Sequence, residues 1–193
     1  MPLLPELIVT PRLHLRVPEA ADSVELNATV SASFSELTRW LPWAQEPQTL
    51  ADSEEYCRRS REKWLADECL NLLMVTKSDG AIIGGTGYPR LDWKVPRFEI
   101  GYWCSTAAVG GGYVTEATYA LAAYAFSELS AARVELRVDD LNESSWRVAQ
   151  RLGFRLEGVL RSDTRDASGR LRDTRVYGAV ALQDLRSNGP AAG

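Results

Sequence analysis

A glycine run between a predicted strand and a predicted helix is the segment of this sequence best suited to chemistry. Gly110, Gly111 and Gly112 follow the stretch 97–104 and precede the alanine-rich stretch 113–129. Backbone N–H groups converge where a loop opens a helix, and the helix dipole favours negative charge there. Glycine also lets the chain approach phosphate oxygens without a Cβ collision. The segment therefore predicts a site for a phosphate-bearing ligand.

Two well-known phosphate loops do not fit this run. A Walker A loop requires a lysine after its last glycine, where Tyr113 stands. The dinucleotide fingerprint requires a third glycine where Thr115 stands, which disfavours a nucleotide-binding oxidoreductase. A second glycine cluster, 84–87, is followed by Pro89 and no helix signal, so it indicates a bulged strand.

Histidine and cysteine chemistry is disfavoured by count and spacing. The only histidine, His14, lies in an alternating polar and apolar stretch and is interpreted as a partly exposed strand residue. No G-x-S-x-G nucleophile elbow is present. Cys57, Cys69 and Cys104 share no metal-ligand spacing, so we expect reduced thiols and no metal. The chemistry should then depend on carboxylate, hydroxyl and backbone groups.

Length and composition indicate one ordinary soluble domain. The chain has 193 residues, of which 45% are hydrophobic and 25% charged. We place a single domain over 1–186 and predict a disordered tail over 187–193. The net charge of −4, with both signs mixed along the chain, argues against direct nucleic-acid binding. No apolar stretch approaches the length that spans a bilayer, and the start does not resemble a signal peptide, so we expect a cytoplasmic protein.

The elements that must position the glycine run follow from hydrophobic periodicity and from turn and cap residues. They are, in order, a strand over 13–17, a helix from Pro18, a capped helix from Thr49 to about Asp67, strands over 72–77, 81–88 and 97–104, a helix over 113–129, a strand over 133–138, a helix over 142–152, and strands over 154–161 and 174–182. This order, β-α-α-β-β-β-α-β-α-β-β, predicts an α/β (α+β) mixed sheet with helices packed on its faces.

Three motifs, taken with their order and spacing, resemble the RimJ/RimL branch of the GNAT superfamily of N-acetyltransferases. They are Ile100-Gly101-Tyr102-Trp103, then Gly110-x-Gly112-Tyr113-x-Thr115-Glu116-Ala117, then Asp140-x-Asn142-x-x-Ser145 with Leu152-Gly153-Phe154. The opening Thr10-x-Arg12-Leu13-x-Leu15-Arg16 and the segment Trp40-Leu41-Pro42-Trp43 are similar too, and the resemblance spans about 9–182. It implies a mostly antiparallel central sheet flanked by helices.

The resemblance implies acetyl-CoA as co-substrate and assigns residues to it. The CoA pyrophosphate would lie on backbone amides of Val109, Gly110, Gly111, Gly112, Tyr113, Val114 and Thr115. The pantetheine arm would pair with the strand end at Tyr102, Trp103 and Cys104, and the Asn142 side chain would hold it. The sequence departs from the family where Ala107 and Gly111 replace polar or basic residues, so phosphate binding should depend on amides and the helix dipole.

In such enzymes an amine attacks a thioester, and a base accepts the amine's proton. The resemblance assigns the base to Glu99, which could instead be a strand residue paired with Arg97 or Arg133. It assigns protonation of the leaving thiolate to Ser145, which could instead be an ordinary first-turn helix serine. Many relatives carry a tyrosine seven residues after the asparagine, but that position is Ala149 here.

The acceptor is left open between two classes of amine. A carboxylate base suits a protein N-terminus, whose amine has a pKa of about 7.7–8.0, better than a lysine, at about 10.4. The resemblance also points to ribosomal-protein N-termini, and a small-molecule amine is the alternative. A CoA-binding sensor without turnover is a further alternative, favoured by Ala107 and Ala149.

Four tryptophans lie outside the predicted cofactor-binding half. They are Trp40, Trp43, Trp64 and Trp93. Trp40, Trp43 and the loop 91–93 could wall the acceptor groove, although buried aromatic residues are the default interpretation. Exposed tryptophans are also favoured interface anchors, so we predict a C2 homodimer whose interface borders the groove.

Overall fold

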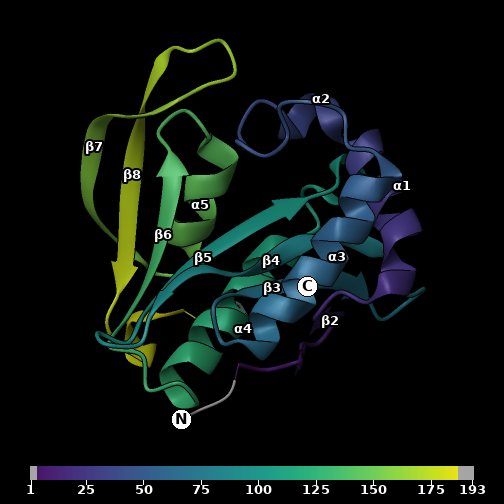
Figure 1. Ribbon diagram of the computed structural model, residues 1–193. Helices are drawn as coiled ribbons and strands as arrows, with labels where there is room; N and C mark the ends of the chain where they lie inside the picture. Colours follow the sequence, from purple (N-terminus) through teal and green to yellow (C-terminus); the bar gives the residue numbers. More distant parts are fainter. Residues whose placement is uncertain (1–3, 187–193) are drawn as a thin grey trace.

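The computed structural model describes residues 4–186, which form one mixed sheet with helices on both faces (Figure 1). The predicted tail over 187–193 lies outside the described residues. The strands are β1 (Leu7–Val9), β2 (Leu13–Arg16), β3 (Leu70–Thr76), β4 (Ile82–Asp92), β5 (Arg97–Cys104), β6 (Arg133–Asp139), β7 (Arg155–Arg165) and β8 (Leu171–Ala179). The helices are α1 (Ser23–Ala32), α2 (Phe34–Leu37), α3 (Leu50–Leu65), α4 (Tyr113–Ser127) and α5 (Glu143–Arg151), with short 3-10 turns η1 (Ala20–Asp22), η2 (Thr106–Ala108) and η3 (Leu182–Asp184).

The strand order across the sheet is β1-β2-β3-β4-β5-β6-β8-β7. Neighbouring strands run antiparallel except β5 and β6, which are parallel. These two pair only over three positions, from Arg97 opposite Arg133 to Glu99 opposite Glu135. Beyond Glu99 they diverge and leave a V-shaped gap (Figure 1). The predicted mixed, mostly antiparallel sheet flanked by helices is confirmed.

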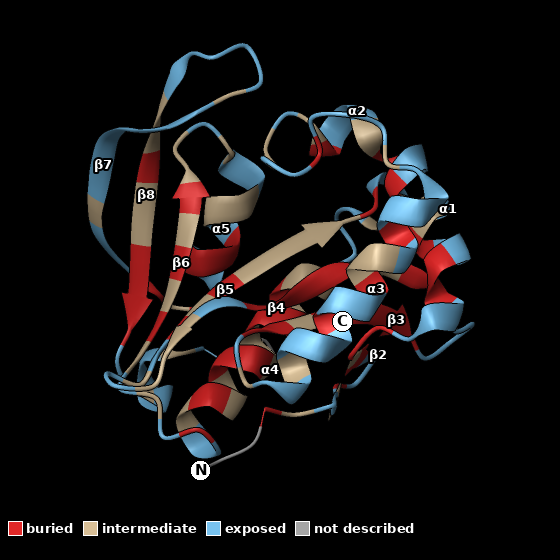
Figure 2. Cartoon of the chain, in the orientation of Figure 1, coloured by how far each residue is buried: buried red, intermediate tan, exposed pale blue. Residues whose placement is uncertain are grey.

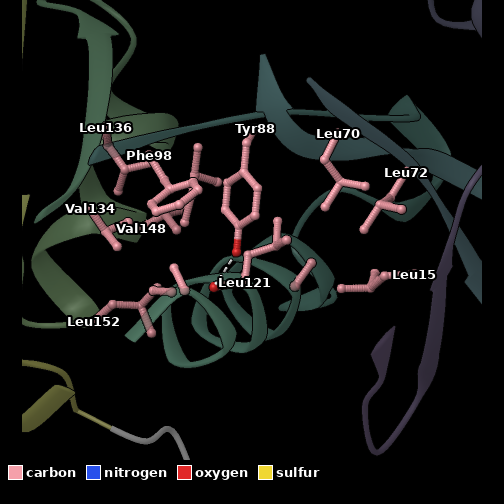
Figure 3. Close-up of a cluster of buried hydrophobic side chains, with 14 of the residues drawn as sticks. Leu15, Leu70, Leu72, Tyr88, Phe98, Leu121, Val134, Leu136, Val148 and Leu152 are labelled. Carbon is pink, nitrogen blue, oxygen red and sulfur yellow. Dashed lines mark hydrogen bonds between the residues drawn. The ribbon is translucent and has the colours of Figure 1, made fainter. Parts of the chain in front are cut away.

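The main core lies between the sheet and the helices α4 and α5 (Figure 3). Tyr88 of β4 and Phe98 of β5 meet at a ring-centroid distance of 5.1 Å, and the Tyr88 hydroxyl donates a 2.6 Å hydrogen bond to the Leu121 carbonyl of α4. A smaller cluster under α1 and α3 buries the opposite face, where Leu73 and Val75 of β3 point. Both faces of the central strands are therefore covered (Figure 2).

Several element boundaries differ from the sequence prediction. Strand β1 is not predicted, because it is three residues long and largely exposed. The helix expected from Pro18 begins later, as η1 followed by α1. Strand β4 continues through Pro89, which was expected to lie beyond its end. The β4–β5 register shifts between Gly87 and Arg90, so the ladder tolerates a residue without an N–H there.

Candidate active site

The glycine run forms the exposed turn that opens α4, as predicted. Gly110 and Gly112 have φ values of 85° and 77°, in the left-handed region that favours glycine. Gly112 is the N-cap of α4, so the amides of the first helical turn have no carbonyl partner within the helix. These amides and the helix dipole create a site that suits an anion such as a pyrophosphate.

Arg12 of the β1–β2 turn fixes the glycine run in place. Its Nη1 donates to the Gly111 carbonyl at 2.8 Å, and its guanidinium lies 4.4 Å from the centre of the Tyr113 ring. Its Nε pairs with the Glu116 carboxylate of α4 at 2.6 Å. Burial opposes the charge of Glu116, but hydrogen bonds from Thr10 and Arg12 outweigh it and hold the Glu116 pKa below its usual value. An Arg12–Glu116 ion pair therefore stands beside the loop and ties it to α4.

Arg151, the last residue of α5, places a second guanidinium near the start of α4. Its Nη2 donates to the Thr115 hydroxyl at 3.5 Å, across a separation of 36 residues. Arg151 thus brings a guanidinium to the start of α4, where Ala107 and Gly111 carry no charge, while the guanidinium of Arg12 is paired with Glu116. Sequence reasoning missed both contacts. Arg12 stood inside a motif already noted, whereas nothing in the local pattern marked Arg151.

The outer half of β5 faces the V-shaped gap. Residues after Glu99 pair with β4 on one side, and no pairing with β6 is found there among the described residues. The three residues predicted to lie beside the pantetheine point to different faces. The Tyr102 and Cys104 side chains pack toward the main core, whereas the Trp103 ring lies on the opposite face, 6.0 Å from Trp43. A ligand in the gap can therefore contact all three residues only through their backbone groups.

Asn142 and Ser145 lie at the start of α5, across the gap from Tyr102. The Asn142 Oδ1 caps the helix by accepting the Ser145 N–H at 3.2 Å and the Ser144 hydroxyl at 2.9 Å. Its amide NH₂ has no partner among residues 4–186, so two donors are available to a ligand. The Ser145 hydroxyl lies 2.9 Å from the Tyr102 hydroxyl.

A cleft of about 890 Å³ opens on the face of the sheet that α1 and α3 cover. Its floor includes glycines 85, 87 and 101, and its walls include Trp40 and Trp43 with residues 163–167 of the β7–β8 turn region. Trp43 is 45% exposed. The segment 91–93 does not line this cleft, because Trp93 packs edge-on against Phe98, 5.4 Å between ring centres.

Glu99 lies in this cleft at the point where β5 and β6 part. Its side chain is 16% exposed, and its carboxylate accepts from Arg90 Nη1 at 3.2 Å. The alternative pairing with Arg97 or Arg133 is not seen, since Arg97 faces Asp92 and Arg133 binds Glu135.

The surroundings of Glu99 suit a base of moderate strength. Burial raises the Glu99 pKa, Arg90 and Arg137 lower it in part, and the cross-strand neighbour Glu135 adds to the rise. A carboxyl whose pKa is raised holds a proton more firmly once it has accepted one, which is what proton abstraction from an amine requires.

Residues 4–186 contain neither a helix suited to a membrane nor a cluster suited to a metal ion. No helix in this range combines the length and the hydropathy that crossing a membrane requires. Within the same range, no group of three or more histidine, cysteine or acidic side chains gathers as a metal site would need.

Comparison with known proteins agrees with this geometry. Residues 12–155 match the family model described as an acetyltransferase (GNAT) domain. The chain is 29% identical over 175 residues to the uncharacterized N-acetyltransferase p20 of Bacillus licheniformis, covering 89% of this chain and 94% of that protein. It is 30% identical over 154 residues to YdaF of Bacillus subtilis strain 168, whose name provisionally makes it a ribosomal N-acetyltransferase, covering 79% and 83%.

Solved structures show the same fold. The acetyltransferase MccE of microcin C7 self immunity, determined with acetyl-CoA and AMP, has a TM-score of 0.83 at 25% identity, covering 93% of this chain and 98% of MccE. RimL, a ribosomal L7/L12 α-N-protein acetyltransferase determined with CoA, has a TM-score of 0.85 at 19% identity, covering 92% and 99%. The chain therefore belongs to the GNAT family, as an acyl-CoA-dependent N-acetyltransferase of the RimJ/RimL type that uses acetyl-CoA as co-substrate.

Proposed function

We propose that this enzyme acetylates the N-terminal α-amino group of a protein. RimL is described as a ribosomal L7/L12 α-N-protein acetyltransferase, and the name of YdaF provisionally makes YdaF a ribosomal N-acetyltransferase. The observation that carries the proposal is the position of Glu99. It is the last β5 residue that pairs with β6, and its carboxylate faces the cleft. A base at this point can accept a proton from an amine in the cleft while that amine attacks a thioester in the gap.

The residues around the gap fit acetyl-CoA. Backbone amides of residues 109–115, with Arg12 and Arg151 nearby, would bind the pyrophosphate. The Gly111 N–H is less available, because it donates to the Ala108 carbonyl at 3.3 Å. The free backbone edge of Tyr102–Cys104 would pair with the pantetheine, and the Asn142 NH₂ would hydrogen-bond to it. Bound acetyl-CoA supplies the activated acetyl carbon, while these residues hold it in a fixed orientation toward Glu99.

The reaction then needs one proton acceptor and one donor. Glu99 accepts the amine proton, directly or through water, as the new C–N bond forms. The C–S bond breaks with its electron pair on sulfur, and in this proposal Ser145 donates a hydrogen to it. An α-amine, with a pKa of about 7.7–8.0, needs only a moderate base near neutral pH. That match favours a protein N-terminus over a lysine side chain.

A thiol-release assay with a panel of acceptors tests the proposal. The panel contains a peptide with a free N-terminus and an internal lysine, the same peptide blocked at its N-terminus, and free amino acids and aminoglycosides. We expect CoA release with the free peptide alone and the acetyl group on its α-nitrogen by mass spectrometry. Equal release with the blocked peptide would contradict it.

A small-molecule amine is the second candidate, and the aromatic wall of the cleft favours it. Trp43 is 45% exposed beside Trp103 and Trp40, and such indole faces can stack on a flat ring. The solved structure of MccE holds AMP as well as acetyl-CoA. Amines that carry a nucleotide therefore belong in the same panel, where release with these alone would favour this candidate.

We further propose that the enzyme is cytoplasmic and forms a C2 homodimer whose interface borders the acceptor cleft. Exposed aromatic side chains are favoured interface anchors, and Trp43 is exposed at the cleft rim. Trp64 and Trp93 are partly buried against the core and contribute less to this argument. Light scattering at micromolar concentration should give twice the chain mass, and a monomer mass would remove the dimer.

A further inference from the structure

One hydrogen-bonded contact spans the gap between β5 and α5. The Tyr102 hydroxyl lies 2.9 Å from the Ser145 hydroxyl and 3.1 Å from the Ser145 carbonyl oxygen. Among the described residues it is the only side-chain hydrogen bond found between the outer half of β5 and α5. The residues come from elements 43 positions apart in sequence, so nothing local requires them to meet.

Counting hydrogens shows what the contact can do. Each of the two hydroxyls carries one proton, and the carbonyl carries none. If Tyr102 donates to the Ser145 hydroxyl oxygen, the serine proton is left for a third partner. If Tyr102 donates to the carbonyl, the serine proton is directed to Tyr102. Small rotations of the two hydroxyl hydrogens interconvert these arrangements without moving a heavy atom.

An ordinary first-turn serine behaves differently. Serine in a helix commonly bonds a backbone carbonyl of its own helix or caps its own N-terminus. Here Asn142 provides the cap, and the Ser145 hydroxyl has no partner other than Tyr102 among residues 4–186. Its orientation is therefore set by a side chain from another element. Burial raises the pKa of Tyr102 to about 12, so this side chain remains a proton donor at any working pH.

We propose that Tyr102 is a positioning residue that holds the Ser145 hydroxyl toward the sulfur of CoA. The proposal rests on the proposed role of Ser145 as the hydrogen donor to the leaving group. As the C–S bond breaks and sulfur takes its electron pair, Ser145 donates its hydrogen to sulfur while Tyr102 donates to the serine oxygen. If the proton passes fully to sulfur, water returns one to Ser145. Tyr102 keeps its own proton throughout.

A binding experiment without turnover tests this directly. The affinities of CoA and desulfo-CoA are measured by calorimetry across the pH range in which the CoA thiol ionises. A hydrogen bond to a charged group strengthens an interaction by about tenfold or more. The wild type should therefore gain about tenfold for CoA over desulfo-CoA as pH rises, since the bound thiolate is stabilised. Tyr102→Phe and Ser145→Ala should both lose most of that gain.

Two controls separate positioning from general damage. Tyr124→Phe removes a hydroxyl from the C-terminal half of α4 and should keep the full gain. Arg151→Gln removes the charged side chain whose field reaches the Tyr102 hydroxyl. It should lower the affinities for CoA and desulfo-CoA together without changing their pH-dependent ratio. A ratio that follows Arg151 instead of Tyr102 would overturn the proposal.

Turnover provides the second readout. Tyr102→Phe should lower kcat about tenfold with little change in the KM for acetyl-CoA, and it should have no further effect in a Ser145→Ala background. Acyl donors with a more acidic leaving thiol should abolish the Tyr102→Phe defect. Additive losses, or a defect independent of the leaving thiol, would return Tyr102 to a packing role. Because the binding test needs no acceptor, its outcome is independent of whether the acceptor is a protein N-terminus.

Discussion

Replacing Glu99 with glutamine tests the centre of the proposed chemistry. The amide keeps the shape of the side chain and removes its ability to accept a proton. General bases contribute about 10²–10⁴-fold to a rate, so we expect kcat/KM to fall by that range near neutral pH while CoA affinity stays within about twofold. The loss should shrink at high pH, where more of the α-amine is already neutral.

The charges around Glu99 predict the direction of a pH shift. If Glu99 is the base, the acid limb of the kcat/KM profile follows its pKa, because the protonated carboxyl cannot accept a proton. Arg90→Gln removes a cation and should move the limb to higher pH. Since Arg90 is 74% exposed, its pair is worth about 0–1 kcal/mol, which limits the move to less than about one pH unit. Glu135→Gln removes a carboxylate and should move the limb to lower pH.

The assay is thiol release from saturating acetyl-CoA, followed from below the Glu99 pKa to above that of the amine. Glu157→Gln is the matched control, because it makes the same chemical change in a carboxylate that pairs with Arg133 outside the cleft. It should leave both rate and profile unchanged. An unchanged rate in Glu99→Gln, or limbs that move the same way in Arg90→Gln and Glu135→Gln, would refute Glu99 as the base.

Three other outcomes follow from contacts described above. Gly110 and Gly80 both have a left-handed φ, and a Cβ added at either position would have open space around it. Gly110→Ala and Gly80→Ala should therefore each lower stability by about 1 kcal/mol. Only Gly110→Ala should weaken CoA binding, by about tenfold in calorimetry. Arg151→Gln should weaken CoA binding several-fold. Because salt screens charges, added salt should reduce this difference in affinity between the wild type and Arg151→Gln. Tyr88→Phe should lower the free energy of unfolding in urea by about 1 kcal/mol without changing kcat, and a change in kcat alone would contradict its assignment to the core.

The sequence predicted the fold well where local signals were strong. The glycine run before an alanine-rich stretch predicted the turn at Gly112. Thr49 with Asp52 predicted the start of α3, whose capping box is confirmed. The order of strands and helices was then enough to predict a mixed sheet with helices on its faces. Local rules were misleading at Pro89, where a register shift in the ladder accommodates a residue expected to end the strand.

The contacts that shape the site were harder to predict, because they join distant segments. The family resemblance singled out Glu99 and Ser145 as candidate catalytic residues, but it gave no partner for either side chain. Arg90 reaches Glu99 from the neighbouring strand, and Tyr102 reaches Ser145 across a gap. Such pairings depend on strand register and on where β5 and β6 separate. Neither is encoded in a short window of sequence.

The position of the gap has a consequence for strand pairing between this protein and other chains. An unpaired strand edge is normally a template for pairing with another chain, and proteins protect such edges with charges, prolines or cover. The free edge of β5 lies inside the sheet, between β4 on one side and β6 with α5 on the other. A second polypeptide strand that paired with this edge would bring its side chains into contact with β6 and α5, which leave it little room. A slender chain that carries amide groups and only small substituents, such as pantetheine, is the kind of molecule that can use this edge.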